Sequence, residues 1–137
     1  MSVSCDYCGR AAELVTGDAL YPGRDDLRHL QFWRCGPCRA HVGCHRKGAI
    51  VRIQGGSVTS DGTMPLGRLA NAELRLAKGR AHAAFDPLWK DGEMSRHRAY
   101  RWLAKQIGIA PDDCHIGMFD LEQCRAVVRA VRERSHA

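Results

Sequence analysis

Two pairs of cysteines lie in the N-terminal part of the chain, and two residues separate the members of each pair. The first pair is Cys5 and Cys8, and the second is Cys35 and Cys38. A spacing of two residues lets the backbone fold into a tight knuckle whose amide groups point at the sulfurs. Four thiolates at about 2.3 Å complete the tetrahedral coordination of zinc. The sequence therefore predicts one structural Zn²⁺ held by these four side chains.

Three alternatives to this ligand set remain open. The thiols could be free and buried, or the zinc could be catalytic, although four thiolates leave no coordination position for water. Cys44 follows closely and could replace one of the four ligands. We expect Gly9 and Gly36 to supply the conformational freedom that the two knuckle turns need.

A Cys-His dipeptide occurs twice, as Cys44-His45 and as Cys114-His115. The two dipeptides could together bind a second metal ion, or form a packed contact between the two halves of the chain. Each is a poor chelate by itself, because adjacent side chains in an extended chain point to opposite faces. The alternative is that the cysteines are small buried side chains and the histidines satisfy local hydrogen bonds.

His82 and Asp86 are four residues apart in a predicted helix, and Trp89 follows them. Such a pair could transfer protons, and together with His115 it could serve a nuclease whose Trp89 stacks on a base. We favour a packing cluster with one internal hydrogen bond. The chain contains no phosphate-binding glycine loop, no serine nucleophile motif and no paired carboxylates suited to Mg²⁺. We therefore expect that the protein is not an enzyme, with a nuclease as the alternative.

The chain is basic, with 21 Lys and Arg against 15 Asp and Glu, a net charge of +6 and a pI of about 9.2. This balance permits contact with nucleic acid or with an acidic protein surface without demanding either. Basic residues gather on the outer faces of two predicted helices, where they form either a phosphate-binding surface or an ordinary solvated face. They are Arg96, Arg98, Arg101, Lys105, Arg125, Arg129 and Arg132.

The first 65 residues favour strands and turns. Segments 12–16 and 31–34 are expected to be short strands beside the cysteine pairs, with a polar loop at 18–30 between them. Residues 49–59 place apolar side chains around a Gly-Gly dipeptide, which predicts a hairpin.

Three helices are expected in the rest of the chain. The first is capped by Asn71 and ends before Pro87, and the second begins after Ser95 and ends at Gly108. The third begins after Asp120, and its inner face contains Cys124.

The length and the composition limit the class of protein. At 137 residues the chain has the size of one ordinary domain or two small ones. Its apolar runs are too short to span a membrane, and its first residues do not have the pattern of a signal peptide. We therefore expect a cytoplasmic protein, in which thiols stay reduced and paired cysteines bind metal.

A series of short motifs extends over nearly the whole chain, and together they resemble the small zinc-finger-containing domain family found in bacteriophages and prophages. The resemblance implies the zinc ribbon with its four cysteine ligands, and it implies a phage or prophage setting in a bacterial host cytoplasm. It implies no further functional residues, and residues 46–64 form a longer stretch than the family pattern has. In order, the motifs are Cys5-x-x-Cys8-Gly9, Phe32-Trp33-x-Cys35-x-x-Cys38, Val42-Gly43-Cys44-His45, Pro65-Leu66-Gly67-x-Leu69-Ala70-x-Ala72-Glu73-Leu74-Arg75, Ala81-His82-x-Ala84-Phe85-Asp86-Pro87-Leu88-Trp89 and Cys114-His115-Ile116-Gly117-Met118-Phe119-Asp120.

The expected fold is α+β. An antiparallel zinc ribbon with an inserted hairpin, residues 1–65, is expected to pack on a three-helix unit, residues 66–137, as one compact body. We expect a non-enzymatic binding module that acts on nucleic acid or on a host protein complex that handles it, in transcription or defence. The alternatives are a metal-dependent or His/Asp-based nuclease and a structural or assembly protein.

Overall fold

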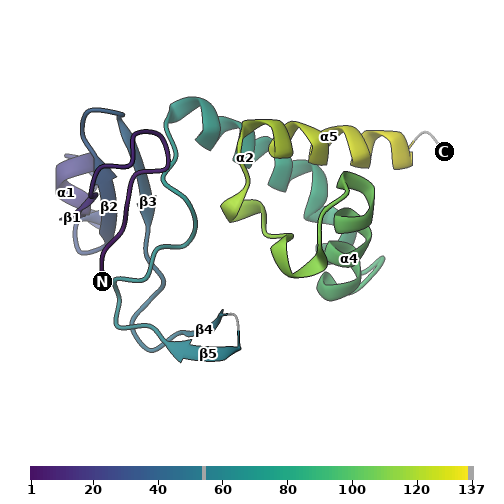
Figure 1. The fold of residues 1–137 in the computed structure, drawn as a ribbon, viewed down its shortest axis with the longest axis horizontal. Helices are drawn as coiled ribbons and strands as arrows, with labels where there is room; N and C mark the ends of the chain where they lie inside the picture. Colours follow the sequence, from purple (N-terminus) through teal and green to yellow (C-terminus); the bar gives the residue numbers. More distant parts are fainter. Residues whose placement is uncertain (54, 136–137) are drawn as a thin grey trace. The chain divides into compact units, whose positions relative to one another are not determined.

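The chain forms two compact units, Met1–Ala72 and Glu73–Ala137, in a computed structural model that describes residues 1–53 and 55–135. The fold class is α+β, as predicted, with antiparallel strands in the first unit and helices in the second (Figure 1). Residues 66–72, which we expected with the helices, belong to the first unit. The predicted packing of the ribbon on the helices stays a prediction.

A three-stranded antiparallel sheet forms the centre of the first unit, in the order β1-β2-β3. Its strands are β1 (Glu13–Thr16), β2 (Gln31–Cys35) and β3 (Ala40–Gly43). Trp33 of β2 lies opposite Leu14 on one side and Val42 on the other. The first two strands confirm the sequence prediction. The third was not predicted, because only Val42 among its residues strongly favours a strand.

The connection between β1 and β2 contains more structure than the expected polar loop. It includes a short helix, α1 (Gly17–Leu20), and a 3-10 turn at Asp25–Leu27. The Gly17 amide donates to the Leu30 carbonyl at 2.9 Å. A Cβ atom at Gly17 would lie 1.8 Å from the Leu27 carbonyl oxygen, so only glycine fits at this position.

The core of the first unit lies between the sheet and the cysteine knuckles. Trp33 is 7% exposed, and its indole nitrogen donates to the Thr63 carbonyl at 2.6 Å. The buried members of this core are Cys5, Trp33, Cys35, Ala40 and Leu69, and Val3, Ala12, Cys38, Val42 and Cys44 pack against them.

Residues 66–71 return to the N-terminal knuckle and close the first unit. The Leu69 amide donates to the Asp6 carboxylate at 2.7 Å, and the Asn71 amide donates to the Tyr7 hydroxyl at 3.2 Å. Ala70 also exchanges two backbone hydrogen bonds with His41 of β3. These contacts explain why the segment belongs with the ribbon.

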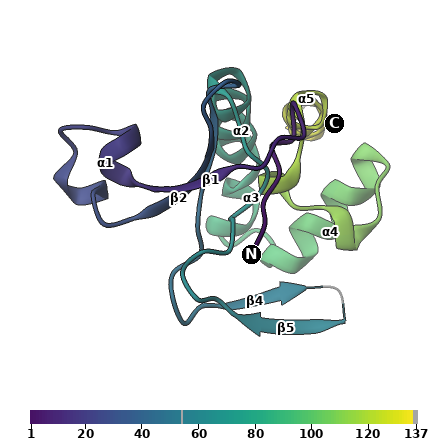
Figure 2. The same ribbon diagram turned by 60° about the vertical axis from the view of Figure 1, so that its left-hand side comes forward.

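The predicted hairpin is present as a separate two-stranded sheet (Figure 2). It consists of β4 (Ile50–Ile53) and β5 (Gly56–Thr59), which pair antiparallel; residue 54 lies outside the described residues. At its base, the buried Ser60 hydroxyl donates to the His45 carbonyl at 3.3 Å and accepts from the Gly62 amide at 3.0 Å. The Ser60 side chain therefore anchors the base of the hairpin to the neighbouring backbone.

The second unit contains the three predicted helices and one short additional helix. The additional helix begins at Pro87, because proline suits the first helical position, where no intrahelical amide donor is needed. Two 3-10 turns, at Pro111–Asp113 and Ile116–Met118, connect the last two helices. The helices are α2 (Ala72–Phe85), α3 (Pro87–Lys90), α4 (Arg96–Ile107) and α5 (Leu121–Ser135).

Both ends of α4 and the start of α5 are capped at the predicted residues. The Ser95 hydroxyl accepts from the Arg98 amide at 3.1 Å, and Gly108 ends α4 in the left-handed conformation. At α5, the Asp120 carboxylate accepts from the Gln123 amide at 2.8 Å, while the Gln123 side chain accepts from the Asp120 amide at 3.0 Å. This reciprocal arrangement is a capping box.

Apolar side chains from all four helices and the 3-10 turns fill the core of the second unit. Phe85 is fully buried, and its ring packs edge-on against Tyr100 at 4.6 Å between centroids. Among the described residues, no helix is both long and apolar enough to cross a membrane. The buried side chains are Leu74, Ala81, Phe85, Leu88, Ala99, Leu103, Ala104, Cys114, Ile116, Phe119, Cys124, Val127 and Ala130.

Candidate metal centre

Two backbone turns carry the four cysteines. In the first turn, the Gly9 amide donates to the Cys5 carbonyl at 2.9 Å. The second turn follows directly from β2, whose last residue is Cys35. Its backbone is closed by the Arg39 amide, which donates to the Gly36 carbonyl at 3.1 Å.

The residue after each cysteine pair adopts the left-handed backbone conformation. Gly9 has φ of 75°, and Arg39 has φ of 52° and is the one such residue other than glycine in the described parts of the chain. The expected role of Gly9 is confirmed. The expected role of Gly36 is wrong, because the left-handed position of the second knuckle falls at Arg39 instead. A side chain in this conformation costs about 1–2 kcal/mol.

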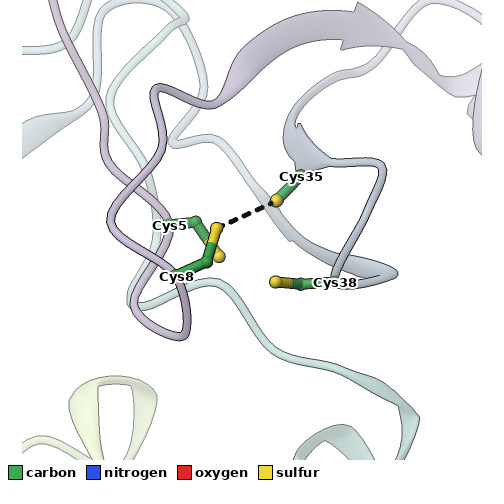
Figure 3. A group of neighbouring side chains, drawn as sticks. All are labelled: Cys5, Cys8, Cys35 and Cys38. Atoms are coloured by element: carbon green, nitrogen blue, oxygen red, sulfur yellow. Dashed lines mark hydrogen bonds between the residues drawn. The ribbon is translucent and has the colours of Figure 1, made fainter.

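The four cysteine sulfurs converge on one point (Figure 3). All of them lie within 4.8 Å of one another, and the Cys8 and Cys35 sulfurs are 3.7 Å apart. Zinc–sulfur bonds of about 2.3 Å in a tetrahedron place neighbouring sulfurs about 3.8 Å apart. The residues therefore fit one zinc ion, and no other group of three or more potential ligands occurs in the described residues.

The surroundings of the sulfurs shift the pKa values of two of the thiols in opposite directions. A hydrogen bond from the Arg10 backbone lowers the pKa of Cys8 to about 7, whereas contact with the Cys8 sulfur, together with burial, raises the pKa of Cys38 to about 12. Thiols packed this closely cannot all ionise without a compensating cation. A divalent ion bound among them supplies that charge and deprotonates the coordinating thiols.

The donor set determines what the metal can do. Four thiolates fill the tetrahedral coordination of zinc and leave no position for water or substrate, so the site is structural. Cys5 and Cys35 are 2% and 3% exposed, whereas Cys8 is exposed. The zinc therefore connects the buried core to a surface loop of the first unit.

The two Cys-His dipeptides lie in different units. Cys44 packs against the core of the ribbon and is not part of the metal cluster, so the four predicted ligands converge without it. The His45 amide donates to a backbone carbonyl at 2.8 Å. Cys114 is buried in the helical unit, where burial raises its pKa to about 11, and His115 follows it. A joint site or contact between the dipeptides stays a prediction.

His82 and Asp86 form the hydrogen bond expected from their spacing, with 3.2 Å between Nδ1 and Oδ1. Lys90 lies on the same side, 3.7 Å from the other Asp86 oxygen. The His82 side chain is about half exposed, at 45%. In the described residues, neither this pair nor His115 belongs to a group of three or more potential metal ligands.

The predicted basic surface divides between the helices. On α4, all four basic residues are exposed, and the Arg96 guanidinium lies over the Tyr100 ring at 4.8 Å. On α5, the basic residues line a groove together with Arg80 of α2, which the sequence analysis missed. Arg80 lies seven residues after Glu73, so the two residues share one face of α2. The sequence gives no sign that α5 lies beside this face and turns it into a groove. The residues of the predicted basic surface are all exposed: Arg96, Arg98, Arg101 and Lys105 on α4, and Arg125, Arg129 and Arg132 on α5.

A protein family described as a zinc-finger-containing domain matches residues 1–134. The chain belongs to this family. No curated protein and no solved structure matches the chain. The family and the four converging sulfurs agree on one conclusion, which is that this zinc-finger domain is a zinc-binding module with one structural zinc.

Proposed function

We propose that this protein is a non-enzymatic binding module of phage or prophage type. It acts on nucleic acid or on a host protein that handles nucleic acid. The observation that carries the proposal is the closed set of four cysteine ligands, because a zinc without an open position stabilises a fold and catalyses nothing. The surfaces that the fold displays then perform the function.

The zinc compensates for the small core of the first unit. Cys5 and Cys35 are ligands and also members of that core, which otherwise contains Trp33, Ala40 and Leu69. Structural zinc contributes on the order of 10 kcal/mol to folding such regions. The metal therefore holds a short sheet and long connections rigid enough to recognise a partner.

The charge of the helical unit supports a partner rich in negative groups. The net charge of the chain is +6, and exposed Arg98 and Arg101 on α4 face solvent, as do Arg125 and Arg129 on α5. Such residues attract either phosphates or the carboxylates of an acidic protein. The resemblance to phage and prophage proteins supports a bacterial host as the source of that partner.

Affinity purification with and without nuclease tests the proposal. The zinc-loaded chain, immobilised through a terminal tag, is exposed to bacterial lysate, and retained protein and nucleic acid are quantified. We expect a specific macromolecule to be retained by the native chain and lost with Cys38→Ser, which removes a zinc ligand. Retention of no macromolecule above the level of this variant would contradict the proposal.

A nuclease is the second candidate, and the His82–Asp86 hydrogen bond of 3.2 Å favours it. A histidine held by a carboxylate can act as a general base. If the candidate is correct, the native chain hydrolyses DNA or RNA, and His82→Ala removes this activity while the far-UV circular dichroism spectrum stays unchanged. Absence of hydrolysis by the native, zinc-loaded chain removes this candidate.

A further inference from the structure

A groove of about 560 Å³ runs between α2 and α5 within the helical unit. The two helices lie side by side in both views of the molecule (Figures 1 and 2). An ion pair of 3.9 Å between Glu73 and Arg125 joins the first turn of α2 to the second turn of α5. The groove is lined by Glu73, Leu76, Ala77, Arg80, Leu121, Cys124, Arg125, Val128, Arg129 and Arg132.

The groove face of α2 differs from its core face. Leu76 and Ala77 lie in the middle of the groove face, with Glu73 and Arg80 one turn to either side. This is the i, i+3, i+4, i+7 spacing of one helical face. Leu76 is 57% exposed, although leucines that pack within a unit are normally buried. The core face, in contrast, contains Leu74, Ala81 and Phe85.

The α5 side of the groove has an apolar floor and a basic rim. Leu121, Cys124 and Val128 contribute aliphatic or thiol surface to the floor, and they follow one another at helical spacing. The α5 rim consists of Arg125, Arg129 and Arg132. A partner that fills the groove must therefore offer apolar side chains at its centre and negative groups at its edges.

Four arginines and one glutamate give the groove lining a positive charge. Arg125 and Arg129 form ion pairs of 3.9 and 3.5 Å with exposed glutamates, and such pairs contribute little stability. In the described parts of the chain, Arg80 and Arg132 form no ion pair. Arg80 and Arg132 are thus open to a partner's carboxylates, and the weak surface pairs of Arg125 and Arg129 can be exchanged for them. Arginine binds carboxylates through paired hydrogen bonds.

We propose that this groove binds an acidic amphipathic helix of a protein partner. Such a helix places an apolar stripe on the floor and its flanking carboxylates against the arginine rim, which is the helix-in-groove mode of recognition. Nucleic acid fits less well, because none of the described residues that line the groove is aromatic and could stack on a base, and phosphates leave the aliphatic floor uncovered. This inference rests on the proposed function and names the class of its partner.

The first arm of the test selects a ligand. A displayed library of peptides of about 18 residues, or five helical turns, keeps leucine at i, i+3, i+4 and i+7 and randomises the flanking positions. The library is selected on the full-length, zinc-loaded chain. We expect Asp and Glu to be enriched at the flanking positions. A selected set without that enrichment would overturn the proposal.

The second arm locates the binding site with charge reversals. The binding of a fluorescein-labelled selected peptide is measured by anisotropy on Arg129→Glu/Arg132→Glu. The control of equal charge change is Arg46→Glu/Arg52→Glu, at two exposed arginines of the first unit. We expect the groove variant to bind about tenfold more weakly or worse, and the control to bind within about twofold of the native chain. Equal loss in the two variants would show a general charge effect and overturn the proposal.

A variant in the apolar part of the groove and a competition with DNA test the proposal further. Leu76→Ser alters the floor at an exposed position and should also weaken the peptide, while thermal unfolding verifies that all variants fold. Displacement of the peptide by a DNA duplex from the native chain, but not from the groove variant, would assign the groove to nucleic acid instead. If a partner retained from lysate binds the groove variant as well as it binds the native chain, the proposed function stands and only this inference fails.

Discussion

Seven thiols occur in the chain, and their surroundings separate the zinc ligands from the others. The sulfurs of Cys5, Cys8, Cys35 and Cys38 share one point, whereas Cys44 packs against the nearby core. Loss of a residue that only hydrogen-bonds to a zinc ligand typically lowers metal affinity by about 10–100-fold, and loss of a ligand itself lowers it further.

We therefore expect Cys38→Ser to weaken zinc binding by more than about 100-fold, and Cys44→Ser to leave it within a few-fold. Both variants remove one thiol, so they form a matched pair. Competition with a chromophoric chelator measures the affinity, and elemental analysis measures the zinc content. Equal zinc loss in both variants would mean that Cys44 belongs to the ligand set.

Substitutions at the two left-handed residues after the cysteine pairs should change the stability of the ribbon in opposite directions. Gly9→Ala places a side chain at φ of 75° and should destabilise the ribbon by about 1–2 kcal/mol. Arg39→Gly removes the side chain from φ of 52° and should stabilise the ribbon by up to about 1 kcal/mol. Chemical denaturation of the zinc-loaded protein measures both. Destabilisation by Arg39→Gly would show that the arginine side chain contributes more than the strain it causes.

At the scale of elements, α5 depends on its capping box. Asp120→Ala removes the acceptor for the Gln123 amide, so we expect a loss of about 1 kcal/mol. Glu133→Ala, at an exposed position of the same helix, should change stability by less than about 0.5 kcal/mol. Thermal unfolding compares the two variants, and hydrogen exchange of the first turn of α5 verifies where the change acts. A similar loss in both would contradict the role of the cap.

Capping residues are also the reason that the helices were predictable. Ser95, Gly108 and Asp120 act locally, so their effect is visible in a few neighbouring residues. The strand β3 and the helix α1 are short segments without a clear local signal, and tertiary contacts decide them. Gly17 illustrates this, because its need for glycine comes from the carbonyl of Leu27, which sequence patterns do not place nearby.

The candidate sites differ in the same way. The zinc ligands were fully predictable, because the chemistry of the site is contained in the type and spacing of four residues. The groove was not, because it depends on how α2 and α5 lie together, and Arg80 gives no signal of its own. Similarly, the choice of Arg39 over Gly36 as the left-handed residue depends on the position of the second turn relative to β3.

For the molecule as a whole, zinc should support one unit and not the other. We expect a strong chelator to unfold the ribbon while the helices keep their far-UV signal, because the metal site lies entirely in the first unit. Trp33 lies in the ribbon core, and the other two tryptophans lie on helices. The fluorescence of a Trp89→Phe/Trp102→Phe variant therefore reports the ribbon alone.

Acid should have the same effect as the chelator. Protons compete with zinc for the thiolates, so the stabilisation by the metal is present at neutral pH and is lost as the pH falls. The addition of Zn²⁺ at neutral pH should restore the Trp33 signal. A ribbon signal that survives verified removal of the metal would show that the core folds without zinc.

The hydrogen bonds from Leu69 and Asn71 to the N-terminal knuckle also set an order of events during synthesis. All four zinc ligands have been made once Cys38 is added, but Leu69 completes the core only after the hairpin has been translated. At synthesis rates of about 5–20 residues per second, this interval is on the order of seconds. A growing chain can thus bind its metal before it can close its core. The ion then crosslinks the two cysteine pairs in the growing chain until residues 66–71 are made and complete the core.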